Sequence, residues 1–320
     1  MTQLAAARES ARAIDAKIDG TVEGVAYEIV GPLGAPVVAV LGGISSTRHV
    51  TSNAVDWQPG WWEEVVGPGR AIDTTRFLVL SFDYISTSHE SSPVTTLDQA
   101  DALCKVLDHA RIRSLHAIVG ASYGGMVALA FGASDRTRCK RLIVIGAAHE
   151  SDPLATALRH LQRRVIELGA NLGREHDALT IARGIAITSY LTPHYFQERF
   201  VDCASTEPRA LEDRIGSYLR KTGEDFADRW TSEKYHALSL SLDFHRVRPE
   251  DIIAPTTVIA VSSDRLVPVE QCRQLVNRLS GLGQLIEIDS AFGHDAFLGD
   301  AGRVAPFIEE LLNVERRAIA

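Results

Sequence analysis

Short runs of apolar residues alternate along the chain with longer segments in which apolar residues recur at helical spacing. The apolar runs are rich in valine and isoleucine and end at turn residues. Continuous apolar runs of this length predict strands buried on both faces of a sheet. The predicted strands are residues 37–41, 77–82, 115–119, 142–145, 256–261 and 285–288.

Helical periodicity lies between and after these strands. The predicted helices of this part are residues 96–110, 122–133, 269–279 and 304–317. Strands that alternate with helices predict an α/β fold with a mostly parallel central sheet and helices on both faces. The first strands, within residues 22–30, are compatible with an antiparallel start to the sheet.

The pattern changes between residues 151 and 246, where amphipathic segments follow one another without a buried strand. The expected helices of this region are residues 154–168, 178–190, 193–201, 207–221 and 226–244. We therefore predict a core in two parts, residues 1–150 and 247–320, with a helical lid at residues 151–246. Because the insertion follows the strand at 142–145, the lid is expected to cover the carboxyl ends of the strands, where α/β folds bind ligands.

Composition restricts the function classes. The 320 residues are 45% hydrophobic and 23% charged, as in an ordinary globular enzyme, and no apolar stretch is long enough to span a membrane. The first twenty residues are charged and lack the apolar core of a signal peptide, so a cytoplasmic location is expected. The net charge of -8 disfavours nucleic acid as the main partner.

The spacing of the four cysteines restricts their chemistry. Cys104, Cys139, Cys203 and Cys272 are widely spaced, so we expect reduced structural thiols and no metal site.

One cluster of basic residues stands out in the insertion. The segment 159–164 reads Arg-His-Leu-Gln-Arg-Arg. On a helix it predicts a solvated basic face, with a site for an anionic ligand as the alternative.

Ser122 is the first candidate for catalysis. Residues 120–124 read Gly-Ala-Ser-Tyr-Gly, directly after a predicted buried strand and directly before a predicted helix. A serine in this pattern and setting is typical of a nucleophile elbow, in which a tight turn projects the hydroxyl and the glycines allow close packing.

A serine hydroxyl needs a base and an orienting acid to become a nucleophile. In this fold their chain order is serine, acid, histidine. Only one of the 11 histidines, His294, lies beyond the lid, and it follows the last predicted strand. Asp264 follows the preceding strand and is the expected acid, with Asp289 as the alternative.

Acyl chemistry at Ser122 also needs two N–H donors for the oxyanion. One belongs to the residue after the nucleophile, Tyr123, and the other to the loop after the first predicted core strand. That loop reads Gly-Gly-Ile-Ser at residues 42–45, so Gly43 or Ile44 is expected to donate.

Together these motifs resemble the homoserine O-acyltransferases of the α/β-hydrolase superfamily. The segments that carry the resemblance are residues 42–45, 60–74, 120–126 and 293–298, with 182–190 and 217–226 in the lid. The resemblance implies the α/β-hydrolase fold and transfer of an acyl group from acyl-coenzyme A, a co-substrate, to L-homoserine in methionine biosynthesis. It implies a ping-pong mechanism through acyl-Ser122 and small-molecule substrates only, with no bound cofactor.

In that family, the positions of Arg183, Tyr190 and Asp295 hold the amino-acid acceptor. A guanidinium suits a carboxylate and a carboxylate suits an ammonium group. From the residues alone, a surface ion pair for Arg183 and a packing role for Tyr190 remain open. The apolar faces of the lid helices are compatible with a homodimer.

The chain departs from the family at residues 85–93, where the loop is shorter and rewritten. This change affects how far the family's acyl group and acceptor can be expected for this chain. The Leu-Gly-Gly-Ile-Ser signature favours succinyl over acetyl, and Arg48 and His49 are candidates to meet a succinyl carboxylate. The alternatives are a serine esterase with the same triad, an acyltransferase acting on serine or another hydroxyl, and a non-catalytic binding protein of this fold.

Overall fold

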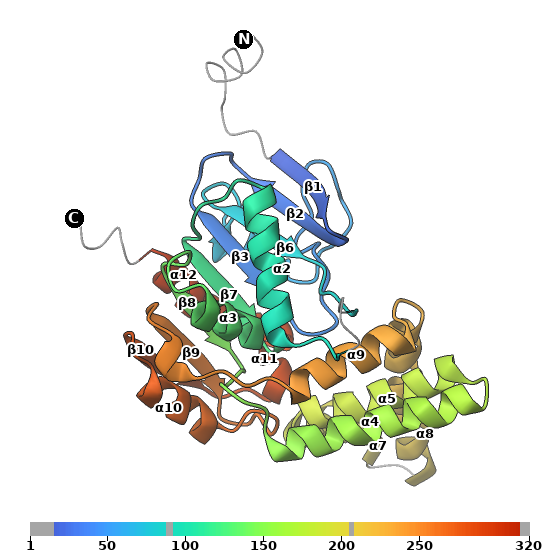
Figure 1. Cartoon of the computed structure of the whole chain (residues 1–320). Coiled ribbons are helices and arrows are strands. Elements are labelled where there is room, and N and C mark those ends of the chain that lie inside the picture. The colour runs from blue at the N-terminus through green and yellow to red at the C-terminus, as the bar shows by residue number, and fades with distance from the viewer. Residues whose placement is uncertain (1–15, 88–91, 205–207, 314–320) are drawn as a thin grey trace.

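An eight-stranded sheet forms the centre of the molecule (Figure 1). The computed structural model describes residues 16–87, 92–204 and 208–313. The strand order is β1-β2-β6-β3-β7-β8-β9-β10; β1 and β6 are antiparallel to β2, and all the other neighbours are parallel. The strands are β1 Ala16–Val22, β2 Val25–Gly31, β3 Val37–Leu41, β6 Leu78–Phe82, β7 Ala117–Ala121, β8 Leu142–Ile145, β9 Thr256–Val261 and β10 Gly283–Ile288. The predicted mostly parallel α/β fold is confirmed.

Alternate residues of the central strands belong to two separate hydrophobic clusters, one on each face of the sheet. In β3, Ala39 and Leu41 belong to one cluster, whereas Val38 and Val40 belong to the other. The first cluster is covered by α2 Thr96–His109, α3 Tyr123–Ser134 and α10 Val269–Arg278, and the second by α12 Ala301–Leu312. Burial on both faces explains why these strands are continuously apolar.

The antiparallel start is a full hairpin. β1 and β2 are joined at Glu23 and Gly24, which have φ values of 48° and 82°. Two consecutive residues with positive φ fit the right-handed twist of a hairpin, and glycine accepts this conformation readily. The prediction of residues 22–30 missed this turn and the strand before it.

The helical insertion lies between β8 and β9 and gathers α4, α5, α8 and α9 beyond one end of the sheet (Figure 1). Its helices are α4 Pro153–Asn171, α5 Glu175–Tyr190, α6 Pro193–Arg199, α7 Val201–Ala204, α8 Pro208–Ala227 and α9 Ser232–Asp243. The prediction of one helix over residues 226–244 is wrong. Phe226 and Ala227 end α8, and α9 begins anew where the Thr231 hydroxyl accepts from the Lys234 N–H.

Other differences lie at the edges of the fold. A two-stranded parallel pair, β4 Val66–Gly67 and β5 Ile72–Asp73, was not predicted. α12 starts earlier than predicted, after the short helices η2 Gly293–Asp295 and α11 Ala296–Gly299, and its predicted end at residues 314–317 lies outside the described residues. Cys104, Cys139 and Cys272 form no disulfide in the described part of the chain.

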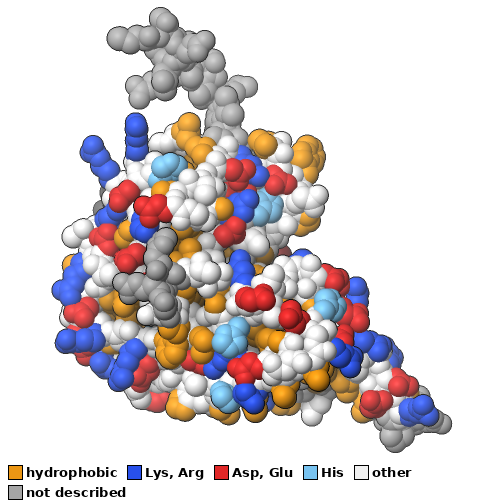
Figure 2. Space-filling view, turned by 45° about the vertical axis from the view of Figure 1, so that its right-hand side comes forward, with side chains coloured by type: hydrophobic (Ala, Val, Ile, Leu, Met, Phe, Trp, Pro, Cys, Tyr) orange, Lys and Arg blue, Asp and Glu red, His pale blue; other side chains and the backbone are white. Residues whose placement is uncertain are grey.

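Charged side chains of both signs are interspersed over the face shown in Figure 2, including the surface of the helical insertion. Within the described ranges, none of the helices combines the length and apolar character needed to cross a membrane.

Candidate active site

Ser122 occupies the sharp turn between β7 and α3. Its φ of 53° lies in the left-handed region, and its N–H donates to the Ile145 carbonyl at 2.8 Å. A Cβ at Gly120 would meet the Gly124 carbonyl oxygen at 2.3 Å, and one at Gly124 would meet the Leu41 carbonyl oxygen at 2.1 Å. The glycines of the motif are therefore required by backbone contact, and the strained turn points the serine hydroxyl away from the sheet.

Three side chains from three strand ends form a continuous hydrogen-bonded chain. Ser122 Oγ lies 2.8 Å from His294 Nε2, and His294 Nδ1 lies 2.7 Å from Asp264 Oδ2. Asp264 follows β9, and its other carboxylate oxygen accepts from the N–H groups of Leu266 at 2.7 Å and Val267 at 3.1 Å. His294 and Asp264 are 7% and 6% exposed, so this chain of hydrogen bonds is largely shielded from water. The arrangement can activate a serine for nucleophilic attack.

Charged neighbours make His294 a stronger base than an ordinary histidine. Burial lowers its pKa, but the charge of Asp264, the hydrogen bond that His294 donates to that carboxylate and the charge of Asp295 outweigh burial, so the pKa is raised above its ordinary value of 6.5. A histidine held this way accepts the proton of Ser122 and stays stable as a cation next to Asp264.

The predicted oxyanion donors Tyr123 and Gly43 belong to segments that adjoin Ser122 or its cavity. Tyr123 is the first residue of α3, so its N–H has no acceptor within that helix. Gly43 lines the same cavity as Ser122. The neighbouring Gly42 carbonyl accepts from the Gly124 N–H at 2.9 Å and from the Tyr84 hydroxyl at 2.8 Å, which ties the loop to the elbow.

A cavity of about 370 Å³ opens above Ser122 between the sheet and the insertion. Arg183, Tyr190 and Asp295 all line it, together with His294. The Arg183 guanidinium lies 4.9 Å from the centre of the Phe226 ring, and it makes no ion pair or hydrogen bond within residues 16–87, 92–204 and 208–313. The alternative of a surface ion pair for Arg183 is therefore not seen among the described residues.

Asp295 is the anionic counterpart in this cavity. Its carboxylate forms no ion pair among the described residues, and burial raises its pKa although Arg183 and His294 act in the opposite direction. The centre of the Tyr190 ring lies 5.6 Å from that of the His294 ring, and burial raises the pKa of Tyr190. One cation and one anion that form no ion pair within the described residues thus face the same space, which suits a small zwitterion.

Comparison with known proteins agrees with this geometry. Residues 36–301 match the α/β hydrolase fold family. The chain is 41% identical over 283 residues to homoserine O-succinyltransferase of Xanthomonas campestris pv. campestris, covering 87% of this chain and 76% of that one. The chain belongs to the homoserine O-acyltransferase family of the α/β-hydrolase superfamily.

Three further proteins show the range of activities among similar sequences and among structures of this fold. The chain is 30% identical to serine O-succinyltransferase of Litchfieldella anticariensis, with 90% of this chain and 92% of that one covered. The structure of homoserine O-acetyltransferase from Bacillus anthracis superposes with a TM-score of 0.80 at 19% identity, covering 94% and 97% of the two chains. Esterase E22 superposes with a TM-score of 0.80 at 21% identity, covering 94% and 99%. Below 25% identity, these two structures show a shared fold only.

The tryptophan-rich segment of this homoserine O-acyltransferase family member supports the oxyanion loop. The Trp61 indole lines the cavity and donates to the Thr47 carbonyl at 3.0 Å, and the Trp62 indole donates to the Phe297 carbonyl at 2.7 Å. The Glu63 carboxylate accepts from the Gly60 N–H at 2.6 Å. The sequence indicated that this segment is characteristic of the family but not that it connects two loops of the site.

The end of α5 is fastened to the loops that carry the acid and the base, which sequence reasoning missed. The Thr192 hydroxyl donates to the Ala291 carbonyl at 2.6 Å, and Arg265 Nη2 donates to the Thr188 carbonyl at 2.6 Å. A Cβ at Gly293 would meet the Tyr190 carbonyl oxygen at 2.4 Å. The lid therefore packs directly on the His294 loop.

The alternative acid is placed elsewhere. Asp289 Oδ1 accepts from the Ser262 hydroxyl at 2.8 Å at the edge of the sheet, whereas Asp264 alone of the two bonds to His294.

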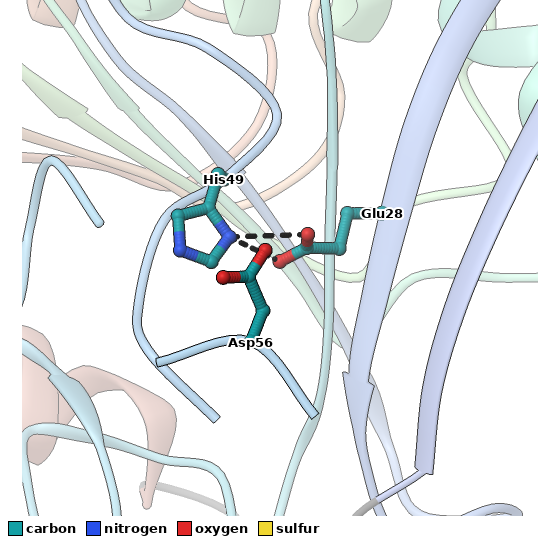
Figure 3. Close-up of side chains that lie close together, drawn as sticks. All are labelled: Glu28, His49 and Asp56. Carbon is teal, nitrogen blue, oxygen red and sulfur yellow. Dashed lines mark hydrogen bonds and ion pairs between the residues drawn. The ribbon is translucent and has the colours of Figure 1, made fainter. Parts of the chain in front are cut away.

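The suggested succinyl contacts of Arg48 and His49 are wrong. Arg48 binds the Asp83 carboxylate at 2.5 Å, and His49 Nδ1 lies 3.1 Å from both oxygens of Glu28 (Figure 3). Neither residue lines the cavity above Ser122. Residues 88–91 of the rewritten loop lie outside the described residues.

Figure 3 also shows the cluster of Glu28, His49 and Asp56, whose ligand atoms lie within 4.8 Å of one another. The Lys17 ammonium is 2.9 Å from Asp56 and 3.3 Å from Glu28. Because this lysine already supplies the positive charge, the cluster is an internal ion-pair network rather than a metal site.

The basic run of α4 is only partly solvated. Arg164 is 55% exposed and pairs with Glu167, as a solvated face predicts. Arg159 and Arg163 are 12% and 7% exposed and bind Asp243 of α9, so the prediction of a solvated face is wrong for both. Helical periodicity shows which residues share a face but not that α9 packs against it.

Proposed function

We propose that the protein is an acyl-coenzyme A-dependent O-acyltransferase that moves a succinyl group, in preference to an acetyl group, onto the hydroxyl of L-homoserine. One observation carries the proposal: the hydrogen-bonded Ser122, His294 and Asp264 open into a cavity that Arg183 and Asp295 also line, neither of them in an ion pair with a described residue. The similarity to homoserine O-succinyltransferase supports both the acceptor and the donor.

The first half-reaction acylates Ser122. His294 Nε2 takes the hydroxyl proton as Ser122 Oγ attacks the thioester carbonyl carbon. The N–H groups of Tyr123 and Gly43 stabilise the oxyanion of the tetrahedral intermediate. When the C–S bond breaks, the proton on His294 passes to the sulfur of coenzyme A, which leaves as the free thiol.

The second half-reaction transfers the acyl group to the acceptor. Arg183 binds the homoserine carboxylate and Asp295 binds its ammonium group, which directs the side-chain hydroxyl toward His294. His294 takes the hydroxyl proton as the oxygen attacks the acyl-serine carbonyl. Collapse of the second tetrahedral intermediate breaks the bond to Ser122 Oγ, and His294 returns the proton to that oxygen.

Serine is the second candidate acceptor, because the serine O-succinyltransferase relative matches 90% of this chain. Serine presents the same carboxylate and ammonium group to Arg183 and Asp295, but its hydroxyl is one methylene shorter. Since one methylene changes binding in a preformed site by about 1–3 kcal/mol, the two acceptors should differ clearly in kcat/KM.

Coenzyme A release with and without an amino acid tests the proposal. The wild-type protein should release coenzyme A from succinyl-coenzyme A only slowly until homoserine is added, and mass spectrometry should find O-succinylhomoserine. Ser122→Ala should lower the rate by about 10⁴-fold or more, because no acyl-enzyme can form.

Ser134→Ala is a matched control, since that serine lies at the other end of α3 and its hydroxyl donates to the Ala130 and Phe131 carbonyls of the same helix. Equal thioester cleavage with and without any amino acid would show a hydrolase instead. A serine product formed faster than the homoserine product would select the second candidate.

A further inference from the structure

The peptide between Gly42 and Gly43 is held through its carbonyl oxygen. This oxygen belongs to Gly42 and accepts from the Gly124 N–H at 2.9 Å and from the Tyr84 hydroxyl at 2.8 Å. Two donors use both lone pairs of the oxygen, so the carbonyl has a fixed direction. Because neither Gly42 nor Gly43 has a side chain, the backbone alone would allow this peptide many orientations. The two hydrogen bonds therefore determine which way it faces.

The direction of the carbonyl also determines that of the Gly43 N–H. The described residues contain no cis peptide bond, so this peptide is trans and planar, and its N–H points opposite to its C=O. Gly43 lines the cavity above Ser122, and its N–H donates to no acceptor in the described part of the chain. A carbonyl held toward Gly124 and Tyr84 thus leaves a free N–H donor on the opposite side of the peptide.

The same two bonds make the Gly43 N–H a stronger donor. Hydrogen bonds that a carbonyl accepts polarise its peptide group, because linked hydrogen bonds reinforce one another. An N–H that stabilises an oxyanion benefits from both effects, since its contribution depends on being aimed and polarised before the charge develops.

The surroundings of Tyr84 fix its hydroxyl in this contact. The side chain is 4% exposed, and its ring meets those of Phe82 and Tyr123 edge to face, with 5.5 and 4.8 Å between ring centres. The next residue is fixed as well, since the Ile85 N–H donates to Gln99 Oε1 at 3.1 Å and its carbonyl accepts from Gln99 Nε2 at 2.7 Å. Burial raises the pKa of Tyr84 well above its ordinary value of 10.0, so the hydroxyl keeps the proton that it donates.

Tyr84 does not line the cavity and stands directly before the rewritten loop at residues 85–93. We propose that Tyr84 is a positioning residue, whose hydroxyl holds the Gly42 carbonyl and so aims the Gly43 N–H at the oxyanion formed on Ser122. This inference rests on the proposed function and adds to it a residue that touches no substrate.

Tyr84→Phe tests the inference, because it removes the hydroxyl alone. The ring keeps its packing on Tyr123, and the Gly42 carbonyl keeps the Gly124 N–H as a donor, so the variant should fold. In the two-step reaction, kcat/KM for succinyl-coenzyme A reports acylation of Ser122, and kcat/KM for homoserine reports its deacylation.

Both steps form an oxyanion at the same place, so Tyr84→Phe should affect them alike. Both kcat/KM values and kcat should fall together by about 10-fold, less than the about 10²- to 10³-fold loss caused by removing an oxyanion donor itself. Each KM should stay within about twofold of its wild-type value, because only binding of the transition state is weakened. A fall in only one of the two kcat/KM values, or a rise in KM alone, would overturn the inference.

The pH profile separates this role from a change at the catalytic base. Tyr84→Phe should lower the plateau of log kcat/KM and leave its rising limb in place, because the charged neighbours of His294 are unchanged. A shifted limb would show that Tyr84 acts through His294 and would overturn the inference.

Labelling of Ser122 gives a readout that needs neither coenzyme A nor homoserine. When a fluorophosphonate reacts, Ser122 Oγ bonds to phosphorus, the hydroxyl proton passes to His294 and fluoride leaves, while negative charge develops on the phosphoryl oxygen. Tyr84→Phe should slow this labelling by about 10-fold as well. If no donor supported homoserine-dependent transfer, the proposed function would fail, and the labelling rate would still decide the role of Tyr84.

Tyr27→Phe is the matched control. Tyr27 is also 4% exposed, but its hydroxyl lies 3.0 Å from His109 Nδ1, between β2 and α2. This variant should keep the wild-type kinetic constants and labelling rate, and thermal unfolding should show that both variants are folded. Equal losses in Tyr84→Phe and Tyr27→Phe, or wild-type rates in Tyr84→Phe, would overturn the inference.

Discussion

The side chains of the Ser122 site depend on one another through charge. Asp264 contributes two of the causes that raise the pKa of His294, whereas burial lowers it. Because only neutral His294 can take the proton of Ser122, activity should increase with pH through a pKa above the ordinary value of 6.5. Asp264 thus influences the pH range in which His294 can accept the proton of Ser122.

Asp264→Asn tests this coupling. Without the carboxylate charge, the burial effect dominates, so the rising limb of log kcat/KM should move to lower pH by about one unit. The maximal rate should also fall by about 10³- to 10⁴-fold, because the imidazole loses its orienting partner. Rates of homoserine-dependent coenzyme A release between about pH 5 and about pH 9 measure both effects.

Asp289→Asn is the control for this experiment, since Asp289 bonds Ser262 and not His294. A rising limb that stayed in place in Asp264→Asn, or moved in Asp289→Asn, would contradict the assignment of the acid.

At the residue scale, sequence could identify the groups that act from strand ends. Ser122, Asp264 and His294 follow three parallel strands, and carboxyl ends of parallel strands meet at one edge of a sheet. The buried position of Arg159 could not be predicted in this way, because it depends on α9, which is about eighty residues away in the chain. Arg48 lies near the oxyanion loop in sequence but binds Asp83 instead of facing the cavity.

At the element scale, the contact between α5 and α8 depends on one glycine. A Cβ at Gly223 would meet the Thr180 carbonyl oxygen at 2.4 Å and its carbonyl carbon at 3.0 Å. The two helix backbones therefore approach each other more closely than a larger residue allows. Gly216, in the same helix, has nothing within 4 Å of its Cβ position.

Alanine at these two positions should have opposite effects on stability. Gly223→Ala should lower the free energy of unfolding by about 1–3 kcal/mol, because the helices must separate. Gly216→Ala should raise it by about 0.5–1 kcal/mol, because alanine is the better helix former and meets no obstacle. Urea unfolding followed by circular dichroism measures both, and a stabilising Gly223→Ala would show that the helices are not in close contact.

Elements were predictable where one local pattern determined them. The apolar runs of β3, β8 and β9 mark strands buried on both faces, and their predicted bounds agree with the structure. The break between α8 and α9 was missed because amphipathic periodicity continues across it, and only the cap at Thr231 marks it. The prediction for the first hairpin did not include β1, because this strand is polar and half-exposed and contains no apolar run that would indicate it.

At the scale of the whole molecule, the lid and the core together enclose the cavity and limit the access of water to it. The cavity has walls from both, and the end of α5 is fixed to the loops of Asp264 and His294. In the proposed mechanism, the acyl-serine survives until the acceptor arrives only if water is poorly placed to attack it. The ratio of transfer to hydrolysis should therefore depend on contacts between lid and core that touch no substrate.

Arg265→Ala tests this dependence. Arg265 Nη2 donates to the Thr188 and Leu191 carbonyls at 2.6 and 3.3 Å, at the end of α5 where the helix has no N–H donors of its own for its last carbonyls. Losing these bonds should loosen the end of α5 and raise homoserine-independent release of coenzyme A about three- to tenfold relative to transfer. Arg273→Ala is the matched control, because that exposed arginine pairs with Glu270 and Glu287, away from the lid. An unchanged ratio in Arg265→Ala, or an equal change in both variants, would mean that closure by the lid does not protect the acyl-enzyme.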